Sequence, residues 1–177
     1  VRGLVGWQYV DIEGTIIRFA RLGMAMTLNG IAQGYITDKV GDILRARGFE
    51  HVLVDMGEQL AVGPKWDGTA WRIGIRDPEN QERIVQTLPL RSGAVATSSN
   101  STTGTNIGSR FPHILDPRTG QPAEHWASVT VVSDRATLSD GLSTALTLLP
   151  LDRWPALMGT AVRVYAKAPG AHEGFWA

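Results

Sequence analysis

The spacing of apolar residues predicts two main helices. One apolar stripe with the helical period consists of Ala32, Ile36, Val40, Ile43 and Leu44. Asn29 is a candidate N-cap and Gly48 stands where a helix-ending glycine belongs, so we expect a helix over residues 30–47. A second stripe consists of Leu138, Leu142, Ala145, Leu146 and Leu149. It predicts a helix over residues 137–149, which ends at Pro150.

Short runs rich in β-branched and aromatic residues predict strands around these helices. Residues 7–11 and 15–20 are expected to form a hairpin. Further strands are expected over 51–55, 59–62, 70–76, 83–90, 94–97, 111–116, 128–133 and 161–166, with a short helix over 152–158. The Ser- and Thr-rich residues 97–106 predict a solvated loop or a polar lining. Because few strands alternate with helices, the pattern favours an α+β fold with a mostly antiparallel sheet.

Size and composition narrow the function classes. The 177 residues predict one domain over 1–177, and 17 Lys and Arg against 17 Asp and Glu argue against a broad nucleic-acid-binding face. The absence of Cys excludes disulfides, thiolate catalysis and Cys-ligated zinc. No apolar run approaches the length of a membrane span. Because strand-like sequence follows Val1 directly, we expect the chain to lack an N-terminal segment.

Asp140 and Thr144 are the first pair of residues that suggests chemistry. They are one helical turn apart, so we expect both on one face of the second helix, away from its apolar stripe. A carboxylate beside a hydroxyl offers two hard oxygen ligands to Mg²⁺ or Ca²⁺. The alternative is a capping box over Thr137–Asp140, in which Asp140 accepts a hydrogen bond from a free N–H group at the start of its own helix. The spacing alone favours the cap.

Two other segments are open to a functional and a structural interpretation. His113, ahead of the turn at Asp116–Gly120, has the chemistry to take a proton from a hydroxyl or to orient a phosphate, but the segment is also an ordinary turn. Gly30 and Gly34 at the start of the first helix would let backbone N–H groups approach an anion, or would let another helix pack closely. Taken alone, both patterns favour the structural interpretation.

Four segments, taken in order, carry a family resemblance. They are Leu28-Asn-Gly-Ile-Ala-Gln-Gly-Tyr35 with Asp38, Ala96-Thr-Ser98, His113-Ile-Leu-Asp-Pro-Arg-Thr-Gly120 and Ser139-Asp-Gly-Leu-Ser-Thr-Ala-Leu146. Together they resemble the motifs of the ApbE family, the FAD:protein FMN transferases, and the first segment resembles the NosX-like branch. The resemblance covers nearly the whole chain but only the C-terminal portion of a typical member. It implies an ApbE-like (T-fold-like), mostly antiparallel sheet with two main helices.

The resemblance also implies an activity. Members transfer FMN from FAD to a Thr or Ser hydroxyl of an acceptor flavoprotein, in a Mg²⁺-dependent reaction that releases AMP. By motif position, Asp140, the Thr144 hydroxyl and the Gly30 carbonyl would hold the metal, and His113 would be the catalytic residue. Contacts to FAD would come from Thr27, Gln33 and Ile114. The acceptor would belong to an electron-transfer or respiratory system, and the location would be the periplasm or the outer side of the inner membrane.

Several positions depart from the family pattern. Thr27 stands where the family usually has Asp, Gln33 replaces a common Lys or Glu, and residues 99–106 are rewritten. These departures favour the alternative of a non-catalytic flavin-binding or accessory module of a respiratory assembly. The retained Asp140, Thr144 and His113 favour the enzyme.

Overall fold

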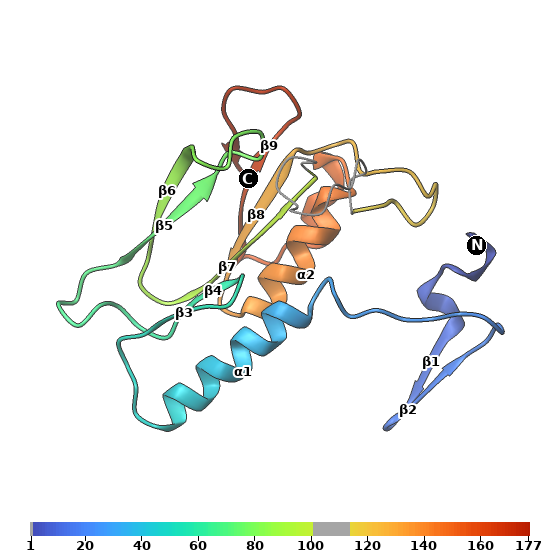
Figure 1. Cartoon of the computed structure of the whole chain (residues 1–177), viewed down its shortest axis with the longest axis horizontal. Helices are drawn as coiled ribbons and strands as arrows, with labels where there is room; N and C mark the ends of the chain where they lie inside the picture. The colour runs from blue at the N-terminus through green and yellow to red at the C-terminus, as the bar shows by residue number, and fades with distance from the viewer. Residues whose placement is uncertain (1, 101–113) are drawn as a thin grey trace.

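The centre of the fold is a six-stranded sheet, seen in a computed structural model that describes residues 2–100 and 114–177. Every pair of neighbouring strands in this sheet is antiparallel (Figure 1). The order across the sheet is β10 (Phe175–Trp176), β9 (Arg163–Lys167), β8 (Ser128–Ser133), β7 (Gly93–Ser99), β4 (Gln59–Ala61) and β3 (Leu53–Asp55). The predicted α+β class with a mostly antiparallel sheet is therefore confirmed.

The two faces of the sheet are covered by different elements. On one face lie α1 (Ala32–Ala46) and α2 (Ala136–Thr147), which pack against each other (Figure 1). Val129 and Val131 of β8 pack on this side with Leu146 of α2. On the other face, β5 (Trp71–Arg76) and β6 (Ile84–Leu90) form a hairpin that packs on Val95 and Val132. All six residues of β8 are buried between these layers.

The C-terminus of α1 follows the prediction, and its N-terminus does not. Gly48 has φ of 82° and donates its N–H to the Arg45 carbonyl at 3.0 Å, while the Phe49 N–H reaches the Leu44 carbonyl at 3.1 Å. This is a Schellman motif, which local sequence alone specifies. Asn29 is not the N-cap, because Ile31 holds that position and makes no side-chain cap.

The apolar stripe predicted for α2 is wrong in part. Leu138 is 42% exposed, whereas the buried residues are Ala136, Ser139, Asp140, Ser143, Leu146 and Thr147. Small hydroxyl side chains let the helix lie close to β7 and β8, and they bond locally. Ser139 Oγ lies 2.8 Å from Ser133 Oγ and 3.4 Å from the Ala94 carbonyl. Asp140 therefore faces into the protein and not away from the core.

Most other predicted elements are present within one or two residues of their expected bounds. β1 (Val10–Glu13) and β2 (Ile16–Phe19) form the predicted N-terminal hairpin, which stands apart from the central sheet (Figure 1). η1 (Arg2–Leu4) and η2 (Trp7–Tyr9) precede it, so the strand predicted over residues 7–11 begins only at Val10. η3 (Leu151–Ala156) replaces the predicted short helix. β7 continues through Ser99, where a loop was expected, and β10 was not expected. No described helix is long and apolar enough to span a membrane.

Two predictions are only partly covered by the described residues. The strand expected over 111–116 begins outside them, and its described end contains one isolated bridge, between Leu115 and Pro122. The single domain over 1–177 stays a prediction.

A buried ion pair joins the β5–β6 hairpin to the central sheet. Lys167 of β9 is 1% exposed, and its Nζ lies 2.7 Å from Oδ1 of Asp77, which follows β5. The hydrogen bond from Lys167 lowers the pKa of Asp77 below its ordinary value. Arg83 is also near this carboxylate, at 3.6 Å, but it is exposed. Lys167 is therefore the main charge partner of Asp77.

Replacing Lys167 with Met should lower the free energy of unfolding by about 3 kcal/mol, because it leaves the Asp77 carboxylate buried beside Arg83 alone. Adding Asp77→Asn to Lys167→Met should recover part of this loss. Urea denaturation of both variants measures the effect. The exposed Lys39→Met variant is the control, with an expected change within about 0.5 kcal/mol.

The ion pair between Lys167 and Asp77 makes the stability of the fold depend on pH. The folded-state pKa of Asp77 is lowered, so its contribution to stability is complete above the unfolded-state pKa near ~4 and is lost as the pH falls through the folded-state value. Wild type and Lys167→Met should therefore converge in acid. A stability difference that stays constant down to low pH would contradict the assignment.

Candidate functional site

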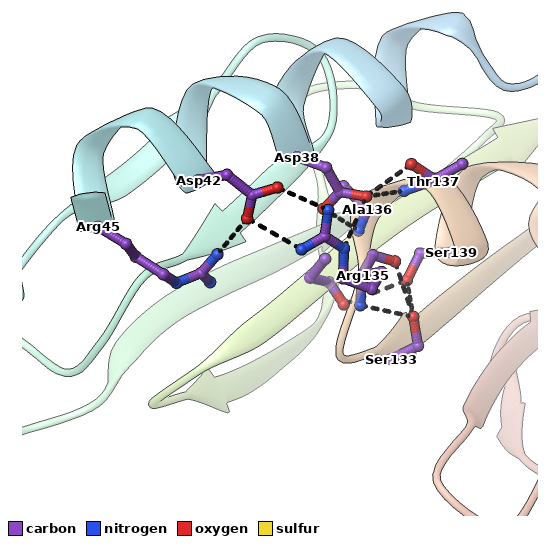
Figure 2. A network of polar contacts seen from close by, with 9 residues as sticks. Asp38, Asp42, Arg45, Ser133, Arg135, Ala136, Thr137 and Ser139 are labelled. Atoms are coloured by element: carbon purple, nitrogen blue, oxygen red, sulfur yellow. Dashed lines mark hydrogen bonds and ion pairs between the residues drawn. The ribbon is translucent and has the colours of Figure 1, made fainter.

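The N-terminal turn of α1 and the N-terminus of α2 are capped by each other's aspartates. Asp38 of α1 accepts hydrogen bonds from the Ala136 N–H at 2.8 Å and from the Thr137 N–H and hydroxyl at 2.9 and 2.6 Å (Figure 2). In return, Asp140 of α2 accepts the Gly34 N–H at 2.9 Å through Oδ2. Each carboxylate thus satisfies N–H groups that the other helix leaves free.

The capping-box interpretation is therefore wrong about which helix Asp140 caps. Asp140 does cap, but its bond goes to α1 and not to the start of α2. Asp38 already holds the Ala136 and Thr137 N–H groups, so the start of α2 needs no local cap. The sequence pattern was misleading because the real partner is 106 residues away.

Gly34 allows the two helices to approach so closely. A Cβ at this position would lie 2.4 Å from the Ala136 carbonyl oxygen and 2.7 Å from Asp140 Cβ. At Gly30 the situation differs, because a Cβ there would meet only the Thr144 methyl group, at 3.9 Å. The helix-packing interpretation is thus confirmed for Gly34, and Gly30 lies beside Thr144.

The two capping aspartates differ in their charge partners. Arg135 lies 3.3 Å from Asp38 and forms a two-bond pair with Asp42, which also binds Arg45 at 3.1 Å (Figure 2). The hydrogen bond from Arg135 lowers the pKa of Asp42. Asp140, by contrast, forms no ion pair with any described Lys or Arg, although it is only 6% exposed. Burial accordingly raises the pKa of Asp140, while the Gly34 N–H lowers it.

The two hydroxyl groups of Ser143 and Thr144 follow Asp140 on α2 and contact the end of β7. Ser98 Oγ, at the end of β7, is 3.0 Å from Thr144 Oγ1 and 2.7 Å from Ser143 Oγ. Thr144 is half-buried. The Thr144 methyl group faces the position of Gly30, while its hydroxyl contacts Ser98. A carboxylate, a hydroxyl and a backbone carbonyl are all oxygen donors suited to a hard cation, but the role of these three residues as metal ligands stays a prediction.

The other predicted site residues have mixed placements. Gln33, in the first turn of α1, lies beside the β3–β4 turn, with its Nε2 3.1 Å from where a Cβ of Gly57 would be. Thr27 is exposed and accepts the Asn29 N–H at 3.2 Å. Ile114 is buried, and its carbonyl accepts the Ala123 N–H at 3.0 Å. His113 lies outside the described residues. The roles of all these residues stay predictions.

Sequence reasoning missed Glu58, which immediately precedes β4. It is 8% exposed, and its Oε2 has no hydrogen-bond partner among the described residues. Burial and then the negative charge of Asp140 raise the pKa of Glu58 to about 7, against a smaller opposing effect of the Thr97 backbone. No local signal marks this glutamate, because its position depends on β3, β4 and α1 packing together.

The family relationship is now decided by comparison. Residues 1–166 match the ApbE family model. The chain belongs to the ApbE family. It is 33% identical over 161 residues to the FAD:protein FMN transferase of Vibrio cholerae, an alignment that covers 88% of this chain and 48% of the relative. It is 34% identical over 150 residues to the Rhodobacter capsulatus protein of the same name, and this alignment covers 84% of this chain and 28% of the relative. The chain thus spans about half or less of these curated relatives.

Solved ApbE structures share the fold. The ApbE protein of Thermotoga maritima superposes with a TM-score of 0.83 at 29% identity, over 99% of this chain and 58% of that one. The flavin transferase ApbE of Vibrio cholerae superposes with a TM-score of 0.81 at 30% identity, over 99% of this chain and 57% of that one. The ApbE-like fold is therefore confirmed, and the NosX-like branch stays a prediction.

In this ApbE chain, Asp38→Ala should lower the free energy of unfolding by about 2 kcal/mol, because the start of α2 loses its cap. Thermal or urea denaturation measures the loss. Asp42→Ala removes only an exposed ion pair on the same helix and should cost about 0.5 kcal/mol. Equal losses in the two variants would show that the cap is not the stabilising contact.

Gly34→Ala should destabilise the fold by about 3 kcal/mol, because the new methyl group would meet backbone atoms of α2 that cannot move without separating the helices. Gly30→Ala is the matched control. Its methyl group would make only an ordinary van der Waals contact, so we expect the free energy of unfolding to change by less than about 1 kcal/mol. Equal stability of the two variants in chemical denaturation would contradict the close helix contact.

Proposed function

We propose that the protein is an FAD:protein FMN transferase, which passes FMN from FAD to a Thr or Ser hydroxyl of an acceptor flavoprotein and releases AMP. The observation that supports this most directly is Asp140. It is a buried carboxylate without a cationic partner among the described residues, one helical turn from the Thr144 hydroxyl, in a chain of the ApbE family. The curated relatives bear the name of this activity.

The residues present fit a divalent metal ion, and we propose Mg²⁺. Among the described residues Asp140 Oδ1 accepts no hydrogen bond, while Oδ2 is oriented by the Gly34 N–H. With the Thr144 hydroxyl and the Gly30 carbonyl, the donor set consists of oxygens only, which Mg²⁺ prefers over softer ligands. When bound, Mg²⁺ would neutralise negative charge that builds up on the phosphoryl oxygens of FAD.

The transfer step needs a nucleophile and a base. The acceptor hydroxyl oxygen forms a bond to the phosphorus of the FMN half, and the bond from that phosphorus to the bridging oxygen breaks, so that AMP leaves with this oxygen. The hydroxyl proton must go to a base, and we assign this role to His113 on its motif position alone. Asp140 and Thr144 would act by positioning the pyrophosphate through the cation.

Contacts to FAD are proposed for Gln33, Thr27 and Ile114. Gln33 is the best supported, because it lies in the same turn of α1 as Gly34, whose N–H binds Asp140. As a neutral side chain it would contact the flavin nucleotide by hydrogen bonds and not by charge. The family resemblance further supports an acceptor from an electron-transfer or respiratory system, located in the periplasm or at the outer side of the inner membrane.

The test uses the full-length gene product with FAD, MgCl₂ and the acceptor domain of a respiratory flavoprotein. Intact-mass spectrometry should show an acceptor heavier by one FMN. Asp140→Asn keeps the shape of the side chain but removes its charge, so we expect the transfer rate to fall by roughly 100-fold or more. Thr144→Val should also slow transfer, whereas Thr144→Ser, which keeps the hydroxyl, should retain most of it.

Asp42→Asn is the control, because it removes a carboxylate from the same helix pair on the exposed side and should leave the rate unchanged. If the wild-type protein binds FAD but never modifies the acceptor, the alternative of a non-catalytic flavin-binding module is correct. If Asp140→Asn transfers as fast as wild type, the proposed metal site is wrong.

A further inference from the structure

Glu58 is a buried carboxyl group that the proposed ligand set does not use. It is 8% exposed, and Oε2 has no hydrogen-bond partner among the described residues. A buried oxygen without a partner disfavours the folded state, so native proteins rarely keep one without a reason. The question is therefore what Oε2 binds when the site is in use.

The register of the sheet places Glu58 on the side of the helices. Leu60 of β4 pairs with Ala94 of β7, and both pack in the same cluster as Ala136 of α2. Side chains alternate along a strand, so Glu58, two residues before Leu60, lies on the helix side as well. On β7, Ser98 points the same way and bonds Thr144 Oγ1 at 3.0 Å.

Two further observations bring Glu58 to the proposed metal site. The preceding residue, Gly57, lies against Gln33 in the first turn of α1. The negative charge of Asp140 is also close enough to raise the pKa of Glu58. Neither carboxyl group forms an ion pair with a described Lys or Arg. Two neighbouring buried carboxyl groups without a cation form an electrostatically incomplete site.

We propose that Glu58 is the second carboxylate of the cation site, an oxygen donor to the cation itself or to one water in its coordination shell. This inference rests on the proposed function, because it uses the same cation as Asp140 and Thr144. It adds a charged group from the sheet to donors that come from the two helices. A second negative charge would strengthen the hold on Mg²⁺, which is a small and strongly hydrated ion.

The test is Mg²⁺ binding by isothermal titration calorimetry on the full-length protein, alongside thermal unfolding without metal. Glu58→Gln keeps the shape and removes the charge. We expect its Mg²⁺ affinity to fall by at least about tenfold, while its melting temperature without metal stays equal to or rises above that of wild type. The rise is expected because the variant removes a buried charge beside Asp140.

Asp55→Asn is the matched control. Asp55 lies three residues from Glu58 and its charge also raises the pKa of Glu58, but it is exposed and already bonds Gln59. Its Mg²⁺ affinity should stay within about twofold of wild type. If Asp55→Asn and Glu58→Gln weaken Mg²⁺ binding equally, Glu58 acts only through the negative charge that it shares with its surroundings, and the inference is wrong.

Asp140→Asn separates the failure of this inference from the failure of the proposed function. If Asp140→Asn loses Mg²⁺ binding but Glu58→Gln keeps wild-type affinity, Glu58 is outside the cation site and the inference is wrong. If Asp140→Asn itself keeps wild-type affinity, the proposed metal site is wrong. A Glu58→Gln variant that is less stable without metal would show a structural role and would also overturn the inference.

Discussion

The reciprocal caps between α1 and α2 determine where the candidate site lies. Neither helix has a side-chain N-cap of its own, so Asp38 and Asp140 supply these contacts only when the helices are packed together. Close packing in turn requires that Gly34 carry no side chain. Folding therefore fixes Asp140 within hydrogen-bond distance of α1, in the turn that follows Gly30. The contact that holds the helices together also places Thr144 beside Gly30, the residues that the family resemblance predicts as metal ligands with Asp140.

The two caps are chemically equivalent but electrostatically different. Arg135 neutralises the side of the helix pair where Asp38 and Asp42 lie, and this side is a structural ion-pair network. Neither Asp140 nor Glu58 forms an ion pair with a described Lys or Arg. Because a buried charge needs a partner, the first side is complete within the protein, and on the second side we propose that a cation from solution is the partner. This difference distinguishes a functional carboxylate from a structural one better than either residue's sequence context does.

Local sequence predicted the features that depend on local structure. The end of α1 is specified by Gly48, whose positive φ needs no tertiary contact, and the strand bounds follow from turn residues beside apolar runs. The buried face of α2 could not be predicted in this way, because serine and threonine are usually exposed and are buried here only through their contacts with β7 and β8. Pairing of Asp140 with α1 depends on a residue 106 positions away. Glu58 has no motif at all, so only the assembled sheet and helices reveal it.

The incomplete charge balance of the site also links stability to ligand binding. Each unit by which burial raises a carboxyl pKa disfavours the charged folded protein by about 1.4 kcal/mol. A cation that binds only the folded state, present at ten times its dissociation constant, stabilises that state by about 1.4 kcal/mol. Tenfold saturation therefore offsets a pKa shift of one unit. The pKa of Glu58 is raised from 4.5 to about 7, so its burial needs a higher saturation to be offset. In the proposed function, the bound cation would therefore stabilise a protein that keeps Asp140 and Glu58 buried without a positive partner among its described residues. The same desolvation that disfavours the uncompensated carboxyl groups would strengthen their attraction for the ion.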